Sequence, residues 1–514
     1  MNLFAPAGAR LAAFASAVLW LATLAAQDGL ASRTRTIAGF AAAGIDRGLR
    51  DSDPARSVRS AADPALGGRS GAAQYVNGSV IVKFRLGTSP AAQQAMLASV
   101  DGNGTPDLPY AAFDIVALDP DADPEAVARR LDAQPDVEYA QARYRVRPLF
   151  VPNDPLYPQQ WNYRTLDMER AWDINPGATS SVTVAVLDSG LAYRNITLRF
   201  TTSQQRIDGT LFRSLGTIEV PFAAAPDLGG ADRFVAPYDF IWDDATPLDM
   251  DGHGTHVAGT IGQLTNNSTG AAGMAFNVKL MPVKVIDSFW DLYFESPFIG
   301  TDDVVARGIR YAVDNGAKVL NMSIGRTGPP APVVQDAVAY AVSRGAFVSV
   351  AGGNEFREGN QPDRLAEFAP QIAGMVAVSA IGRDRLRAGY STTASYIELA
   401  APGGDASRGG SSAAILQQSY DFDFVETYDL ESGSIRAPRF DIFAFQFFQG
   451  TSMAAPHVSA LAAMLIQQGI TDPAAIEAAM KRYATDLGAA GRDNEYGHGL
   501  IEPRASLRGM GLLR

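Results

Sequence analysis

The sequence predicts an α/β protein: a doubly wound, mostly parallel sheet with helices on both faces, preceded by a small α+β unit. From residue 301 to residue 380, apolar strands alternate with amphipathic helices, as β-α-β units require. The strands in this region are apolar throughout, which is typical of a sheet buried on both faces. Residues 75–147 hold a shorter strand and helix pattern of their own. We therefore expect two units of different architecture.

Composition limits the class of protein. The chain has 514 residues, of which 47% are hydrophobic and 19% charged, and this is ordinary for a globular protein of two or three domains. A net charge of −12 without a run of lysine and arginine argues against a nucleic-acid partner. The sequence contains 0 cysteines, which excludes disulfide bonds and thiolate metal ligands.

The N-terminus has the pattern of an export signal. Residues 11–26 are apolar apart from one serine and one threonine, follow Arg10, and end in the small residues Ala25 and Ala26. This segment is shorter than the roughly 20 residues that a membrane helix needs. We predict that residues 1–26 form a signal peptide and that the product is secreted or periplasmic, without a membrane partner after cleavage. An uncleaved N-terminal anchor is the alternative.

A linker and a small domain follow. Residues 27–73 are rich in Ala, Arg, Gly, Ser and Asp without a helical or strand period, so we expect a low-complexity linker. Residues 74–147 are expected to form the α+β domain. Its predicted elements are a strand at 79–85, a helix at 89–100, a strand at 113–118, a helix at 123–131 and a strand at 137–146. Asp123 as N-cap and Pro124 at the first helical position mark the second helix.

Residues 150–514 are expected to form the doubly wound domain. The predicted elements are a strand at 182–188, a helix at 302–315, a strand at 318–325, a helix at 332–343, and strands at 346–351 and 375–380. The first of these helices has Thr301 as its expected N-cap and Gly316 as its expected stop.

One serine has the surroundings of a nucleophile. Ser452 follows Gly450 and Thr451 at the expected start of an apolar helix, where unpaired N–H groups would stabilise an oxyanion. A base for this serine is available in His253, whose flanking glycines allow another segment to approach the imidazole. Asp188 ends the predicted strand at 182–188, the end at which parallel sheets gather functional groups.

Four segments together resemble the subtilisin-like serine proteases, in the order that family uses. They are VAVLDSG with Asp188, GHGTHVAGT with His253, AGGNE with Asn354, and GTSMAAPHV with Ser452. The resemblance extends over roughly residues 150–505. It implies a serine endopeptidase in which Asp188 orients His253, His253 activates Ser452, and Ser452 forms an acyl-enzyme. It also implies that Asn354 donates its side-chain amide to the oxyanion.

The same resemblance implies how a polypeptide substrate binds. An extended peptide would pair with one segment and face a second across the first specificity pocket, so broad specificity is expected. The substrate-binding residues are Ser323, Ile324 and Gly325 in the first segment and Ala351, Gly352 and Gly353 in the second. Arg326 and Glu355 stand at the expected rim and could change the charge preference. Segments 192–237 and 404–445 are expected insertions, either lining the cleft or peripheral.

For the small domain, the resemblance implies a propeptide that assists folding and then inhibits the enzyme until it is cut between residues 140 and 152. A permanent accessory domain is the alternative. The expected protein is a self-processing zymogen whose partners are polypeptide substrates and its own propeptide, and otherwise a monomer. No cofactor is needed for the chemistry. Structural calcium is suggested by the resemblance of residues 264–270 to a calcium loop and by the acidic residues of 243–251, which could equally form a solvated acidic loop.

Other readings of the same residues are weaker. A zinc hydrolase using His253 and His256 lacks the H-E-x-x-H spacing, and an α/β-hydrolase esterase needs its histidine after the serine. His256, His457 and His498 are expected to be structural. Pro456 lies either in the first turn of its helix or deeper, where it would bend the helix. The open non-enzyme alternative is a secreted binding or scaffold protein on the same frame, with its cleft blocked.

Overall fold

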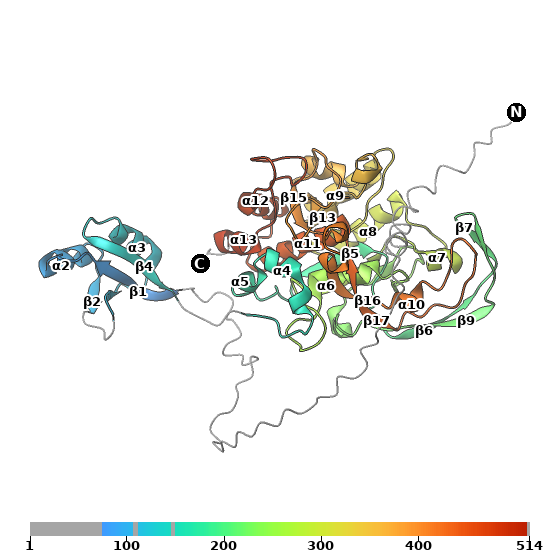
Figure 1. Ribbon diagram of the computed structural model, residues 1–514, viewed down its shortest axis with the longest axis horizontal. Helices are drawn as coiled ribbons and strands as arrows, with labels where there is room; N and C mark the ends of the chain where they lie inside the picture. Colours follow the sequence, from blue (N-terminus) through green and yellow to red (C-terminus); the bar gives the residue numbers. More distant parts are fainter. Residues whose placement is uncertain (1–74, 106–110, 145–149, 511–514) are drawn as a thin grey trace, which may run out of the picture. The chain divides into compact units, whose positions relative to one another are not determined.

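The computed structural model describes residues 75–105, 111–144 and 150–510. These form two compact units, a smaller one ending at residue 144 and a larger one beginning at residue 150 (Figure 1). The predicted signal peptide and linker lie outside the described residues. Within the described ranges, no helix combines the length and the apolar character needed to cross a membrane.

The smaller unit is an antiparallel sheet packed with two helices. The strands lie in the order β2-β3-β1-β4. The bounds are β1 Tyr75–Phe84, α2 Pro90–Ala98, β2 Asn103–Thr105, β3 Asp114–Ala117, α3 Pro124–Asp132 and β4 Val137–Tyr144. Asp123 caps α3 by accepting the N–H of Glu125, as predicted, and only the short β2 was not expected. Val80, Val82 and Leu131, each 0% exposed, lie at the centre of its core.

The larger unit contains a seven-stranded sheet in which every pairing is parallel. Its strands lie in the order β10-β11-β5-β12-β13-β14-β15. Their bounds are β5 Thr183–Asp188, β10 Tyr238–Asp239, β11 Lys279–Lys284, β12 Val319–Met322, β13 Phe347–Ala351, β14 Met375–Ile381 and β15 Leu399–Pro402. The predicted parallel sheet is therefore confirmed.

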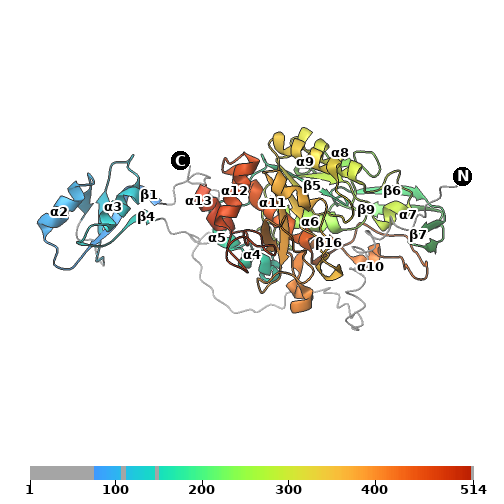
Figure 2. The same cartoon turned by 90° about the horizontal axis from the view of Figure 1, so that it is seen from above.

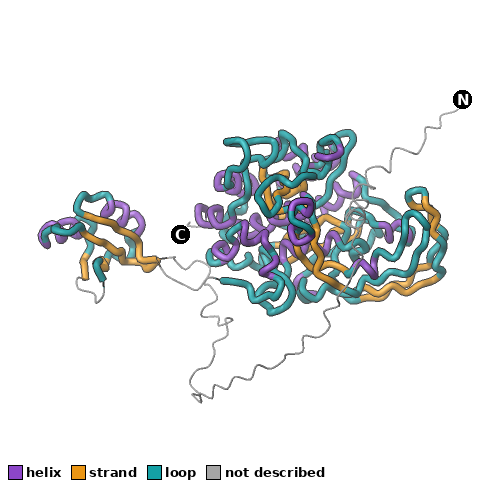
Figure 3. Tube along the Cα trace, in the orientation of Figure 1, coloured by secondary structure: helices purple, strands orange, loops and turns teal. Residues whose placement is uncertain are grey.

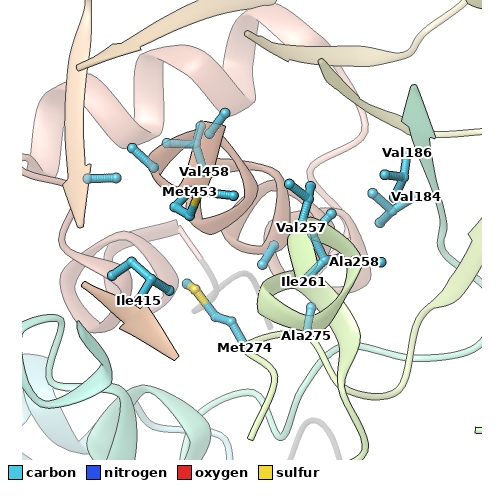
Figure 4. Close-up of a cluster of buried hydrophobic side chains, with 14 of the residues drawn as sticks. Val184, Val186, Val257, Ala258, Ile261, Met274, Ala275, Ile415, Met453 and Val458 are labelled. Carbon is cyan, nitrogen blue, oxygen red and sulfur yellow. The ribbon is translucent and has the colours of Figure 1, made fainter. Parts of the chain in front are cut away.

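Helices bury both faces of this sheet (Figure 2). In β5, Val184 and Val186 belong to the core that contains α6 (His253–Gly262) and α11 (Thr451–Gln467). Figure 4 shows this core, with Val257 and Val458 drawn from the two helices. The alternate residues Ala185 and Leu187 of β5 belong to a second core, which contains α8 (Asp302–Asp314) and α9 (Pro332–Ser343). Alternation along the apolar residues 184–187 of this strand thus supplies two cores.

One predicted capping bond and one predicted strand end differ from the structure. Thr301 is at the N-cap position of α8, but its hydroxyl donates to Asp303 Oδ1 at 2.7 Å and does not accept a helix N–H. Strand β12 ends at Met322, so residues 323–325 lie outside the sheet, because Ser323 contacts α11 instead. The remaining α-helices of the described residues are α4 Trp161–Thr165, α5 Met168–Trp172, α7 Phe289–Tyr293, α10 Phe422–Val425, α12 Pro473–Tyr483 and α13 Pro503–Met510.

The two expected insertions fold as strand pairs (Figure 3). The first contains β6 Ile196–Thr201, β7 Gln205–Ile207, β8 Thr210–Phe212 and β9 Thr217–Phe222. The second contains β16 Ile415–Tyr420 and the first residues of β17 Phe443–Phe448. Phe222 stacks on Phe440 with ring centroids 4.8 Å apart, so the insertions pack on one another. Ser419 of β16 donates to Gly252 O at 2.8 Å, which places the second insertion directly against the start of α6.

Candidate active site

Asp188 and His253 meet at the carboxyl end of β5. Asp188 is the last residue of the strand, is 0% exposed at its side chain, and lies with Oδ1 2.7 Å from Nδ1 of His253. The backbone N–H of Ser189 donates to the same oxygen at 2.8 Å. The carboxylate therefore fixes the imidazole orientation, and with Nδ1 as the donor, Nε2 is left as the basic nitrogen.

Glycines make this approach sterically feasible, as their position beside His253 predicted. A Cβ on Gly254 would stand 2.1 Å from Gly190 O, and one on Gly252 would stand 2.7 Å from Ser419 Oγ. Gly252 also has φ of 106°, which disfavours other residues. A side chain at either position would separate α6 from β5 or from β16.

Two further aspartates surround the start of α6. Asp249 accepts the N–H groups of Gly252 at 2.8 Å and Thr255 at 2.9 Å, and thereby caps the helix. Asp251 Oδ1 accepts the N–H of His253 at 3.1 Å. Burial acts to lower the pKa of His253, but the Asp188 carboxylate, with Asp251 and Asp249 behind it, outweighs burial and raises that pKa to about 9.

Ser452 is the second residue of α11. Its hydroxyl donates to Ser323 O at 3.1 Å. Across the described residues, no hydrogen bond joins Ser452 Oγ to His253. The structure thus brings Asp188 and His253 together and leaves the serine bonded to a different acceptor, as is common before substrate binds.

Pro456 lies six residues into α11, deeper than its first turn. A proline at this depth cannot donate an N–H to the carbonyl four residues earlier, which is that of Ser452. The hydroxyl of Ser323 donates to this oxygen instead, at 2.7 Å. Asn321 Nδ2 in turn donates to Ser323 Oγ at 2.9 Å. The proline therefore leaves the nucleophile's carbonyl free for a bond that ties it to the end of β12.

Asn354 is oriented by Thr451. The side-chain oxygen of Asn354 accepts the N–H of Thr451 at 2.9 Å and its hydroxyl at 3.0 Å. The amide nitrogen is then directed elsewhere: a Cβ on Gly450 would stand 3.7 Å from Asn354 Nδ2 and 3.8 Å from Ser452 Cβ. Asn354 Nδ2 and the nucleophile therefore lie on the same side of Gly450. The sequence analysis assigned no role to Thr451, although its position between Gly450 and the proposed nucleophile Ser452 could have indicated one.

The two predicted substrate segments lie beside these groups. Ser323 contacts Ser452, while Ile324 and Gly325 form no backbone hydrogen bond within the described part of the chain. Such an unpaired segment is suited to strand addition. In the opposite segment Ala351 ends β13, the N–H of Gly352 donates to Val378 O at 2.9 Å, and Gly353 N donates to Thr451 Oγ1 at 3.2 Å. That segment is therefore held firmly.

The two charged residues at the expected rim, Arg326 and Glu355, differ in whether their charge is already paired. Arg326 donates to Asp302 from Nε and Nη2, each at 2.7 Å, so its guanidinium is already paired. Glu355 Oε2 accepts the N–H of Asn354 at 2.6 Å. Burial raises the pKa of Glu355, and the hydrogen bonds that its carboxylate accepts from the Asn354 N–H and the Thr392 hydroxyl oppose the rise.

The other histidines are structural, as expected. His256 Nε2 lies 3.1 Å from the carbonyls of Ile415 and Gln446, and burial lowers its pKa to about 3. His457 lies 2.9 Å from both Met453 O and Asn162 Nδ2, and burial lowers its pKa to about 4. His498 is held through its backbone N–H, which donates to Glu398 O at 2.8 Å.

The loop at 264–270 does not assemble an oxygen cage. Asp154 accepts the N–H groups of Asn266 and Asn267, and Asp227 accepts the side-chain N–H groups of Gln263 and Asn267. The aspartates at 243, 244, 249 and 251 likewise do not gather. No group of three or more His, Cys, Asp or Glu side chains suited to a metal occurs in the ranges that the structure describes. The structure therefore shows no metal site built from such side chains.

Comparison with known families gives two matches. The model of the subtilase family matches residues 179–499, which is more than half of the chain. The model of the fervidolysin N-terminal prodomain matches residues 61–142. The second match covers most of the small α+β unit.

Individual relatives agree with these matches. The thermophilic serine proteinase of Bacillus sp. (strain AK1) is 29% identical over 428 residues, covering 82% of this chain and 86% of that protein. An extracellular protease of Xanthomonas campestris pv. campestris is 30% identical over 386 residues, covering 72% of this chain and 59% of that protein. Among solved structures, proteases from Pseudoalteromonas arctica PAMC 21717 match with a TM-score of 0.53 and 28% identity, covering 70% of this chain and 100% of that chain.

Proposed function

Because the chain belongs to the subtilase family of serine proteases and carries a fervidolysin-type prodomain, we propose that it is an exported endopeptidase that uses Asp188, His253 and Ser452 as its triad. The observation that carries this proposal is the 2.7 Å contact between the buried Asp188 carboxylate and Nδ1 of His253. Helices α6 and α11, which begin at His253 and next to Ser452, pack in the same core, and this supports Ser452 as the nucleophile.

The chemistry follows from this geometry. Ser452 Oγ exchanges its bond to Ser323 O for one to His253 Nε2, attacks the scissile carbonyl, and gives its proton to His253. The C–N bond then breaks as the imidazolium protonates the leaving amine, which leaves an acyl-enzyme. Water, deprotonated by His253, releases the acyl group. Asn354 Nδ2 and the N–H of Ser452 stabilise the oxyanion in both halves of the reaction.

We propose that the enzyme is made as a zymogen. The match to a protease prodomain supports this role for the smaller unit. The proposed self-cleavage lies between residues 140 and 152, after which the propeptide would inhibit until it is removed. Export through residues 1–26 is proposed on the sequence pattern, and the extracellular relative supports it.

Calcium has no part in the proposed chemistry. Beside residues 264–270, the carboxylates of Asp154 and Asp227 accept N–H groups of the loop, and no ion is needed to hold them in place. We therefore assign no ligand to calcium.

The deciding experiment compares the wild type with Ser452→Ala. The wild type should react with a serine-directed phosphonate at Ser452, digest casein, and lose an N-terminal piece that ends between residues 140 and 152, as seen by intact-mass analysis. Ser452→Ala should do none of these. If the folded wild type shows neither the adduct nor digestion, the proposal fails and an occluded scaffold protein becomes the better description.

A further inference from the structure

A buried carboxylate separates the two proposed substrate segments. Asp363 is 2% exposed. Its Oδ2 lies 2.0 Å from where a Cβ on Gly325 would stand, and its Cβ lies 3.2 Å from where a Cβ on Gly353 would stand. Only glycine at position 325 leaves room for this carboxylate. Asp363 therefore contacts one glycine from each wall of the proposed specificity pocket.

Hydrogen bonds fix Asp363 to both walls. The N–H of Arg364 donates to Arg326 O at 2.8 Å, next to Gly325. The N–H of Asp363 donates to the Tyr396 hydroxyl at 2.8 Å, and that hydroxyl donates to Gly352 O at 3.1 Å. The first segment begins at Ser323, which bonds to Ser452, and the second is followed by Asn354, which bonds to Thr451. Asp363 thus lies between the two segments that would form the proposed specificity pocket.

Within the described residues, no cationic side chain pairs with this carboxylate. Asp363 Oδ1 accepts the N–H groups of Leu365 at 2.9 Å and Ala366 at 2.8 Å. The neighbouring guanidiniums are engaged elsewhere, that of Arg326 with Asp302 and that of Arg364 with Glu367 at 2.8 Å. Among residues 75–105, 111–144 and 150–510, no lysine, arginine or histidine lies within 4.0 Å of the Asp363 carboxylate.

A second carboxylate borders the same space. Glu355 Oε2 lies 2.8 Å from where a Cβ on Gly353 would stand. The charges of Glu355 and Asp363 act on one another, since each is close to Gly353. A buried carboxylate without a counter-ion is costly unless a partner neutralises it. A cationic substrate side chain would supply that counter-charge, whereas an apolar one would not.

Resting on the protease function above, we propose that Asp363 determines specificity at the residue whose carbonyl is attacked, and that the enzyme prefers arginine or lysine there. Glu355 contributes from the rim of the pocket. A buried carboxylate discriminates strongly against a neutral side chain of the same shape, because that side chain supplies no counter-charge. We therefore expect cationic side chains to be preferred over neutral ones by about 100-fold or more.

The test uses peptide substrates that differ at one position only. Arginine is compared with citrulline, which has nearly the same shape without the charge, and with leucine. Wild type should cleave the arginine substrate about 100-fold faster in kcat/KM than the citrulline substrate. Asp363→Asn keeps an oxygen that can accept the N–H groups of Leu365 and Ala366, and should bring this ratio close to one. Glu367→Gln, a change at a carboxylate of the same segment that pairs with Arg364, should leave the ratio unchanged.

The outcomes separate this inference from the proposed function. If wild type reacts with the phosphonate and cleaves citrulline or leucine substrates as fast as arginine, the specificity assignment is overturned and the protease remains. If Asp363→Asn lowers Tm but keeps the wild-type ratio, Asp363 is only a turn residue and the assignment is again wrong. If Asp363→Asn does not fold, the arginine to citrulline ratio of wild type decides alone. Failure of the phosphonate reaction would instead remove the proposed function itself.

Discussion

Replacing Asp188 by asparagine tests the electrostatic core of the site. The exchange keeps the shape of the side chain but removes the negative charge that lies 2.7 Å from His253 Nδ1. Burial acts against protonation of His253, yet its pKa is raised from 6.5 to about 9, chiefly by Asp188. This difference corresponds to about 3 kcal/mol in favour of the imidazolium. Asp188→Asn should therefore lower the pKa of His253 substantially and reduce kcat by about 10⁴-fold, the loss known for this change in serine proteases.

The sign of the pH effect follows from linkage. A histidine whose folded-state pKa lies above its unfolded value stabilises the fold fully below pH 6.5, and this contribution is lost as pH rises to about 9. The stability difference between the aspartate and asparagine forms should therefore be larger at pH 6 than at pH 10. Only neutral His253 can accept the serine proton, so kcat/KM of the wild type should rise toward pH 9.

Both effects can be measured separately. Denaturant unfolding of Ser452→Ala and Ser452→Ala/Asp188→Asn, at pH 6 and pH 10, avoids self-digestion. Asp243→Asn is the control, because Asp243 is an exposed aspartate with 48% of its side chain accessible. A stability difference of the same size at both pH values, or a kcat/KM limb below pH 7 in the wild type, would refute the reasoning.

Three further predictions concern the same cleft and its surroundings. Asn354→Ala should lower kcat by about 10²–10³-fold with little change in KM, which is the loss known for subtilisin, a member of the same family. Steady-state kinetics would show this loss, with Glu367→Gln as the control variant. An unchanged kcat would exclude the Asn354 amide as an oxyanion donor. Burial, with Glu355 nearby, raises the pKa of Asp363 to about 7, so the preference for arginine over citrulline should grow between pH 6 and pH 8 in the wild type; a ratio independent of pH would contradict this. Chelation should leave the Tm of the mature enzyme unchanged, because Asp154 and Asp227 already accept N–H groups; a fall of several degrees that calcium reverses would show that a metal binds.

The sequence was most informative where one residue interrupts a local pattern. The apolar run of β5 stops at Asp188, and glycines flank His253, so both positions could be predicted without a structure. Contacts between segments that are distant in the sequence could not be predicted in this way. Thr451 and Asn354 are 97 positions apart, and the Ser323 contact that ends β12 early spans 129. Asp363 lies in a polar stretch that resembles a surface turn. No period or motif encodes such pairs, because they depend on how the sheet brings strand ends together.

Two reciprocal hydrogen bonds between Ser323 and Ser452 indicate how substrate would prepare the nucleophile. Ser323 Oγ donates to Ser452 O at 2.7 Å, while Ser452 Oγ donates to Ser323 O at 3.1 Å. The first bond holds the backbone of the nucleophile and can persist, since Pro456 offers no competing N–H. The second must break before attack. A peptide that pairs with residues 323–325 would compete for the Ser323 carbonyl, so we expect substrate binding itself to release the hydroxyl toward His253. Replacing Ser323 by alanine would remove only the first bond, and should therefore lower kcat more than it raises KM.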